Sequence, residues 1–120
     1  VISPYVVRAI GERQARRYFI SAEVFTAHQA EHFGLVHEVC DDVAAMERRC
    51  DELLLQLALN GPEAMKAAKD LVFAVSQKVI GDDVIDDTAQ RIADIRVGAE
   101  GQEGLSAFLN KRKANWVPEE

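Results

Sequence analysis

Residues 43–75 read VAAMERRCDELLLQLALNGPEAMKAAKDLVFAV, and this stretch decides the fold class. Apolar residues recur every three or four positions on both sides of a break at residues 60–62 (NGP). This spacing predicts two amphipathic helices, because side chains three and four apart lie on one helix face. The Gly-Pro pair ends the first helix near residue 59 and begins the second. The two apolar stripes consist of Val43, Met46, Cys50, Leu53, Leu54 and Leu57, and of Ala64, Met65, Ala68, Leu71, Val72 and Val75.

The sequence on the C-terminal side of this stretch predicts two further helices. Gly81 interrupts the pattern, and a third amphipathic helix begins after it. The acidic residues 82–83 suit the start of that helix, since carboxylates are favourable at the positive end of the helix dipole. A last helix is predicted from Gly104 to about Lys113.

The first 20 residues predict two short helices. Ser3 is expected to cap the first one, with Pro4 in its opening turn, where the missing N–H has no intrahelical partner anyway. This helix should end near Gly11. Residues 12–20 form the second helix, which carries three arginines along one face.

The only extended segment predicted is residues 35–39 (LVHEV). It follows a helix that Thr26 should cap and Gly34 should end. The segment is short and rich in valine, so it is expected to be a strand. A single strand leaves its N–H and C=O groups unpaired, and therefore needs a partner outside this chain. Together with a beginning at Val1 in mid-motif, this suggests a mainly α-helical piece of a larger fold.

Composition narrows the function classes. The chain has 14 Lys and Arg against 20 Asp and Glu, a net charge of −6, which disfavours binding to a long nucleic acid. It contains no apolar run of about 18 residues, so no membrane span is expected. Cys40 and Cys50 cannot form a disulfide scaffold, and a reducing, cytoplasmic setting is the default expectation.

Four motifs, in order, carry a family resemblance. They are residues 10–15 (IGERQA), residues 27–30 (AHQA) followed by 34–36 (GLV), residues 60–64 (NGPEA) with Lys66 and Lys69, and residues 100–116 (EGQEGLSAFLNKRKANW). This series resembles the C-terminal portion of the crotonase (enoyl-CoA hydratase/isomerase) family, whose complete fold is of the ClpP/crotonase-like α/β type. The resemblance implies that residues 1–40 belong to the end of the crotonase core and residues 41–120 to a helical oligomerisation region.

The resemblance also implies an activity for the complete protein. Hydratases of this family add water across the C2–C3 double bond of a 2-enoyl-CoA. The oxyanion hole and the two catalytic glutamates lie upstream, and none of them matches a position here. No catalytic residue is therefore expected in this chain, which should be inactive alone. Residues 2–10 (ISPYVVRAI) look closest to the branch that hydrates methylglutaconyl-CoA. An isomerase, a dehalogenase or a CoA hydrolase of the same family stays open, and so does a non-catalytic helical interaction module.

Two residues of the last predicted helix are expected to touch coenzyme A. The family's F-x-x-K pattern falls on Phe108 and Lys111, which the resemblance places on the adenine and the 3′-phosphate of a neighbouring subunit's CoA. A ring face suits a base and an ammonium suits a phosphate. The family also implies a homotrimer or a dimer of trimers, with the CoA thioester as substrate and no covalent cofactor.

Three other signals have more ordinary explanations. Residues 28–32 (HQAEH) match H-x-x-E-H, but zinc would need a third ligand and the crotonase resemblance already accounts for this helix, so no metal is expected. Arg13, Arg16 and Arg17 are expected on an exposed face or in salt bridges. Arg112 and Lys113 are expected to be mostly solvated.

Overall fold

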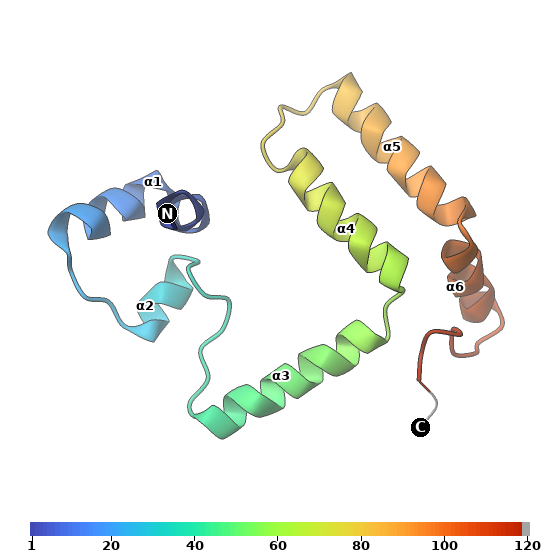
Figure 1. Ribbon diagram of the computed structural model, residues 1–120, viewed down its shortest axis with the longest axis horizontal. Coiled ribbons are helices and arrows are strands. Elements are labelled where there is room, and N and C mark those ends of the chain that lie inside the picture. Colours follow the sequence, from blue (N-terminus) through green and yellow to red (C-terminus); the bar gives the residue numbers. More distant parts are fainter. Residues whose placement is uncertain (119–120) are drawn as a thin grey trace. The chain divides into compact units, whose positions relative to one another are not determined.

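The computed structural model describes residues 1–118, and within that range all regular structure is helical (Figure 1). This confirms the mainly helical fold class. The chain divides into two compact units, residues 1–50 and 51–120. Within the described range, no helix has the length and apolar character that a membrane span requires. The helices are α1 (Ser3–Ser21), α2 (Ala27–His32), α3 (Val43–Ala58), α4 (Pro62–Val75), α5 (Asp82–Val97) and α6 (Ala99–Leu109).

Helix α1 is two helical segments joined at a kink. Gly11 has φ 77° and ψ 158°, which is outside the helical region and accessible mainly to glycine. The predicted break at this residue is therefore confirmed. The predicted cap was wrong: Ser3 lies inside the helix, and no side chain caps its N-terminus. The carbonyl of Ile2 already accepts hydrogen bonds from the N–H groups of Tyr5 and Val6, so the helix starts before Ser3 can act as a cap.

Helix α2 begins at the residue that the sequence predicts. Thr26 Oγ1 accepts a hydrogen bond from Gln29 N–H at 3.2 Å, and Gln29 Oε1 accepts one from Thr26 N–H at 2.8 Å. This reciprocal pair is a capping box, which satisfies two N–H groups that the helix leaves without intrahelical partners. Gly34, with φ 80°, ends the turn after the helix, again as predicted.

Residues 35–39 are not a strand, so that prediction was wrong. Leu35 N–H donates to Ala30 O at 2.8 Å, which commits the start of the segment to the turn that closes α2. No neighbouring strand is available within residues 1–118 to complete a ladder. The segment is instead fixed by Glu38, whose two carboxylate oxygens accept hydrogen bonds from Arg49 of α3 at 2.7 and 2.8 Å.

The unit formed by residues 1–50 has a small aromatic core. The rings of Tyr18, Phe25 and Phe33 contact one another with centroids 4.9 to 5.1 Å apart, mostly edge to face. Arg17 stacks on Tyr18 and forms a two-bond ion pair with Glu23. Two of the three arginines are thus in salt bridges, because Arg16 pairs with Glu12.

Within the described chain the apolar stripe of α3 is exposed, whereas that of α4 is half-buried at Met65, Leu71 and Val75. Neither α3 nor α4 has a buried residue, and Leu54 is 62% exposed. Both helices form at the predicted positions, with Pro62 in the first turn of α4. The first turn of α5 carries Asp82 and Asp83, also as predicted.

Candidate functional site

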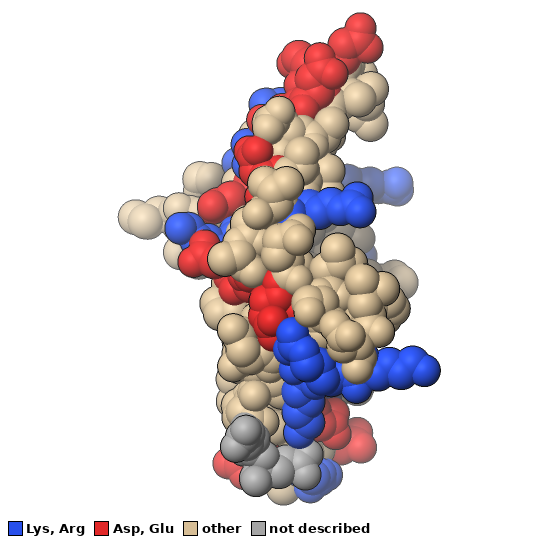
Figure 2. All heavy atoms as spheres, turned by 90° about the vertical axis from the view of Figure 1, so that its right-hand side faces the viewer, with Lys and Arg blue, Asp and Glu red and all other residues tan. Residues whose placement is uncertain are grey.

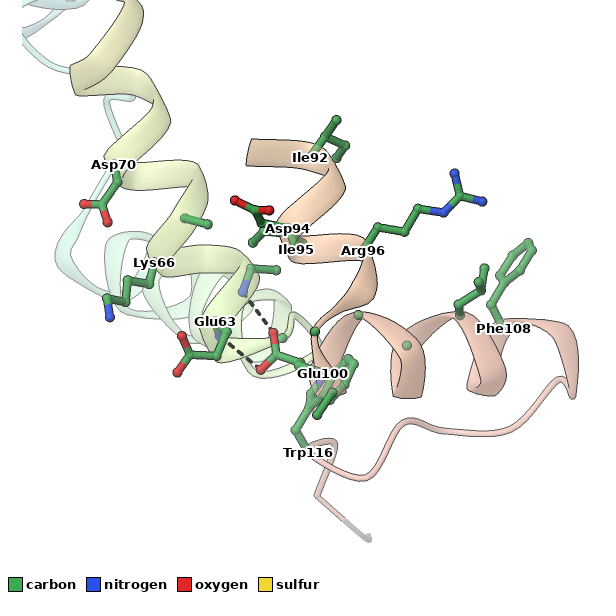
Figure 3. Close-up of a pocket in the computed structure, with 18 residues that line it drawn as sticks. Glu63, Lys66, Asp70, Ile92, Asp94, Ile95, Arg96, Glu100, Phe108 and Trp116 are labelled. Atoms are coloured by element: carbon green, nitrogen blue, oxygen red, sulfur yellow. Dashed lines mark hydrogen bonds between the residues drawn. The ribbon is translucent and has the colours of Figure 1, made fainter. Parts of the chain in front are cut away.

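A hollow of the second unit lies among α4, α5 and α6 and has a volume of about 1010 Å³. In Figure 3, Lys66 and Asp70 of α4 lie on one side, Ile92 and Arg96 of α5 on another, and Phe108 of α6 at the far end. Trp116, from the segment after α6, closes the lower edge (Figure 3). The lining therefore combines apolar side chains with a few charges.

Glu100 joins the start of α6 to the start of α4. Its carboxylate accepts hydrogen bonds from Glu63 N–H at 3.0 Å and from Ala64 N–H at 2.9 Å, drawn as dashed lines in Figure 3. These are two of the N–H groups that a helix N-terminus leaves unpaired, so Glu100 caps α4 from a distant part of the sequence. A Cβ at Gly61 would overlap the Glu100 carboxylate, so any other residue there would require this side chain to shift.

Two glycines let α6 pack closely. A Cβ at Gly101 would overlap the carbonyl oxygen of Ile95, so only glycine lets α6 pass against the end of α5. A Cβ at Gly104 would come within 3.1 Å of the Trp116 ring. The indole N–H of Trp116 donates to Leu59 O at 3.2 Å, which holds the segment after α6 against the unit.

Glu103 and Arg112 form an ion pair that is joined by several hydrogen bonds. The Arg112 guanidinium donates to both Glu103 oxygens at 2.6 and 2.7 Å, and Asn115 N–H donates to Glu103 at 2.9 Å. Arg112 also donates to Ser106 Oγ and to Lys113 O. Arg112 is exposed, as expected, but its guanidinium is held in this ion pair, which the sequence did not predict. The hydrogen bonds from Arg112 lower the pKa of Glu103 from 4.5 to about 2, against partial desolvation and with a smaller contribution from Asn115.

The last helix is displaced from its predicted position. It begins at Ala99 rather than Gly104, and it ends at Leu109 rather than near Lys113. Phe108 lies on the helix and is 79% exposed, whereas Lys111 lies beyond it with φ 51°, in the left-handed region. The two residues are therefore not related by helical i, i+3 spacing, although both are exposed and close in sequence.

The helix ends early because of the backbone bonds that close it. Arg112 N–H donates to Ala107 O at 3.0 Å, and Lys111 N–H donates to Phe108 O at 3.2 Å. This pair of bonds is the Schellman motif, which turns the chain away from the helix axis. Lys111 occupies the left-handed position at which glycine is usual.

The other candidate groups do not assemble into a site. Among residues 1–118, no three or more His, Cys, Asp or Glu side chains gather as a metal site would require. His28 and His32 belong to α2, and His28 Nδ1 lies 3.8 Å from Glu31. Cys40 and Cys50 are free.

The face formed by α5 and α6 carries charges of both signs. Acidic side chains stand at the end where α5 begins, and Lys and Arg side chains extend farther along with acidic groups among them (Figure 2). This face has no continuous basic tract of the kind that follows a nucleic-acid backbone.

Comparison with known proteins identifies the family. The family model for enoyl-CoA hydratase/isomerase matches residues 1–119. A solved enoyl-CoA hydratase from Shewanella pealeana is 43% identical, with a TM-score of 0.85, over 96% of this chain and 42% of that one. The chain belongs to the enoyl-CoA hydratase/isomerase family, and the resemblance carried by the four motifs is confirmed at this level.

Curated relatives catalyse more than one reaction. The 2,3-dehydroadipyl-CoA hydratase of Escherichia coli is 31% identical over 107 residues, covering 89% of this chain and 41% of the relative. The 1,4-dihydroxy-2-naphthoyl-CoA synthase of Mycobacterium tuberculosis is 28% identical over 116 residues, covering 97% of this chain and 36% of the relative. The chain thus spans about two fifths of the length of these relatives.

Sequence reasoning missed the roles of Glu100 and Glu103. Both belong to the motif at residues 100–116 that helped to identify the family, but their partners lie up to 37 positions away or in a turn that was predicted as helix. No local sequence pattern signals either contact, because the fold alone brings each carboxylate to its partners.

Proposed function

We propose that this chain is the C-terminal part of an enoyl-CoA hydratase, which adds water across the C2–C3 double bond of a 2-enoyl-CoA. The observation that carries the proposal is the similarity to the Shewanella hydratase in both sequence and fold, over nearly the whole of this chain. The relative named as a 2,3-dehydroadipyl-CoA hydratase supports the same reaction.

In this proposal the chain supplies no catalytic residue. Two of its glutamates are already committed to structural contacts: Glu100 to the N-terminus of α4, and Glu103 to Arg112 and Asn115. A general acid or base must be able to exchange a proton with substrate near the working pH. Glu103, with its pKa near 2, stays ionised throughout that range. The proton-transferring groups and the donors that stabilise the enolate lie upstream.

The contribution of this chain to the substrate site is a coenzyme A contact. Phe108 offers a ring that is 79% exposed, suited to the adenine of a CoA bound by a neighbouring subunit. Lys111 is exposed on the turn that follows α6, and its ammonium suits the 3′-phosphate. The thioester itself is the substrate, and no covalent cofactor takes part.

The uncovered helices are the part of the chain suited to assembly. Apolar side chains on α3 and α4 are exposed, so contacts with the rest of the protein or with other subunits can bury them. We assign residues 1–40 to the end of the crotonase core and residues 41–120 to oligomerisation as a trimer or a dimer of trimers.

The finer assignments rest on the sequence. Residues 2–10 favour a methylglutaconyl-CoA-like substrate, and hence a role in the breakdown of branched amino acids or fatty acids. Two free cysteines fit a reducing, cytoplasmic setting.

The test is the activity of the complete enzyme and of the isolated chain. The complete enzyme should hydrate 3-methylglutaconyl-CoA with a higher kcat/KM than crotonyl-CoA. The loss of the enoyl absorbance measures both reactions. The purified 120-residue chain should hydrate neither substrate. Hydration by the isolated chain, free of host enzyme, would contradict the proposal that catalysis lies upstream.

A second candidate is a different reaction on the same fold. The similarity to a naphthoyl-CoA synthase over 97% of this chain supports this alternative, because that relative is named for a different reaction. This C-terminal part is equally compatible with an isomerase, a dehalogenase or a CoA hydrolase of the same family. Two active-site glutamates upstream would favour the hydratase, and one or none would favour another member.

A non-catalytic helical module is the remaining alternative. Such a module should run as a compact, discrete oligomer in size-exclusion chromatography when the 120-residue chain is purified alone. A part of a larger enzyme should instead aggregate through its exposed apolar stripes.

A further inference from the structure

We propose that Glu103 is a positioning residue for coenzyme A, because it holds the turn that carries Lys111 and thereby sets where the ammonium meets the 3′-phosphate. This inference rests on the proposed contact between Lys111 and CoA. Glu103 itself touches no part of the substrate in this proposal, and it acts only by fixing the turn.

The first step of the argument is the closure of the turn. Glu103 lies on α6, whereas Arg112 and Asn115 lie beyond the helix, so its bonds connect the helix to residues on the far side of Lys111. The pair is a two-bond guanidinium–carboxylate contact, the ion-pair geometry that best fixes orientation. The Glu103 side chain is only 21% exposed, so solvent screens the pair less than it screens a fully exposed pair.

The second step is the backbone of Lys111. A residue with a Cβ pays a steric cost in the left-handed region, and Lys111 adopts φ 51° there. Such a conformation persists only when the surrounding contacts determine it. The bonds from Arg112 and Asn115 to Glu103 provide contacts of this kind directly after Lys111.

The third step is the anchoring of the segment beyond the turn. Trp116 donates to Leu59 O and its ring lies against Gly104, so the chain is attached again shortly after Asn115. Lys111 therefore stands on a short loop that is tied at the helix and at Trp116. Its side chain remains exposed and can reach a ligand, while its backbone has little freedom.

The fourth step concerns charge. An unpaired carboxylate near the turn would compete with a phosphate for the Lys111 ammonium. Arg112 neutralises Glu103 at 2.6 and 2.7 Å, so the pair holds the turn without adding net negative charge beside it.

The experiment compares two substrates in the complete enzyme. One is the CoA ester, and the other is the same ester of 3′-dephospho-CoA, which lacks the group that Lys111 should meet. Glu103→Gln should raise KM for the CoA ester about threefold to tenfold, with kcat changed less than about twofold. The KM for the dephospho ester should stay near the wild-type value. Lys111→Ala should show the same pattern.

The double variant tests whether the two residues act together. If Glu103 acts through Lys111, Glu103→Gln combined with Lys111→Ala should be no worse than Lys111→Ala alone. Independent effects that multiply would overturn the proposal. Equal KM changes for both substrates, or a large fall in kcat, would also overturn it, because they indicate general damage to the fold.

Two further variants keep the test interpretable. Asp87→Asn removes the ion pair with Arg91 in α5, at 2.8 Å, and should leave the preference for the CoA ester unchanged. Arg112→Lys keeps the charge but loses the two-bond geometry, and should give an intermediate KM. If Lys111→Ala does not change the ratio of the two KM values, the proposed CoA contact is wrong, and the positioning role is wrong with it. If Lys111→Ala changes this ratio and Glu103→Gln does not, only the positioning role is wrong.

Discussion

The turn after α6 and the helix α3 are stabilised in opposite ways. The turn is closed by contacts within this chain: Glu103 binds Arg112 and Asn115, and Trp116 binds Leu59. Helix α3 presents an apolar stripe that the described chain leaves uncovered. The difference is that polar, directional contacts fix the local geometry of the turn, whereas the apolar side chains of α3 have no such partners and stay exposed in the described chain.

The largest expected effect comes from a substitution that disrupts the packing of α6 against the end of α5. Gly101→Ala should destabilise the folded protein by about 3 kcal/mol, because the new Cβ must displace the backbone carbonyl of Ile95. The midpoint of denaturant unfolding of the complete enzyme measures the change. Gly98→Ala is the matched control, since its nearest atom would be 3.4 Å away and its φ of −64° suits alanine. Equal stability of the two variants would contradict the close approach of α5 and α6.

The next prediction tests the exposed apolar stripe of α3. Leu54→Asp should weaken assembly of the complete enzyme by about 2 kcal/mol, if the stripe of α3 is buried there. Size-exclusion chromatography over a concentration series should show smaller species. Gln56→Asp, on the exposed surface of the same helix, is the control for added charge. An unchanged oligomer in the Leu54 variant would show that this stripe is not an assembly surface.

The third prediction concerns how the stability contributed by the Glu103 ion pair depends on pH. The pKa of Glu103 is lowered to about 2 from 4.5, so its pairing contributes stability above the unfolded pKa and loses it as pH falls toward 2. The stability difference between wild type and Glu103→Gln should therefore be constant from pH 8 to about pH 5 and shrink below about pH 4.5. Thermal melts of both proteins across this range measure it. A difference that varies between pH 6 and 8 would require another titrating group.

The smallest effect separates stability from ligand contact. Lys111→Gly removes the steric cost of the left-handed conformation and should stabilise the folded protein by up to about 1 kcal/mol. The same variant should raise KM for the CoA ester, because it removes the ammonium. A higher unfolding midpoint with a higher KM would indicate that this position retains lysine at a cost in stability. A lower midpoint would show that the lysine side chain itself supports the turn.

Local patterns predicted most of the helices correctly. Pro62 and the preceding glycine locate the start of α4, and Thr26 locates the start of α2. Gly11 marks the kink in α1. These predictions succeeded because each depends on groups within four residues of one another. The boundaries of α6 failed because the Schellman turn at Lys111 uses a residue that gives no sequence signal for a left-handed conformation.

The candidate site was predicted mainly from the family resemblance, and only partly from the spacing and chemistry of its residues. Phe108 and Lys111 came from the family pattern, and their contact with CoA stays a proposal. Their expected relation on one helix face was wrong, since Lys111 lies beyond the helix end. The roles of Glu100 and Glu103 could not be read from the sequence, because a carboxylate's partner depends on which backbone N–H or guanidinium the fold brings within 3 Å.

The sequence by itself determined the family, the helical class and the positions at which most helices begin, since these follow from motifs, apolar periodicity and local capping. Only the tertiary structure decided that residues 35–39 form no strand, that Glu100 caps α4, and that Glu103 closes the turn carrying Lys111. The physical reason is that hydrogen bonds to distant partners depend on the packing of whole helices, which α5 and α6 achieve here through the absence of a side chain at Gly101.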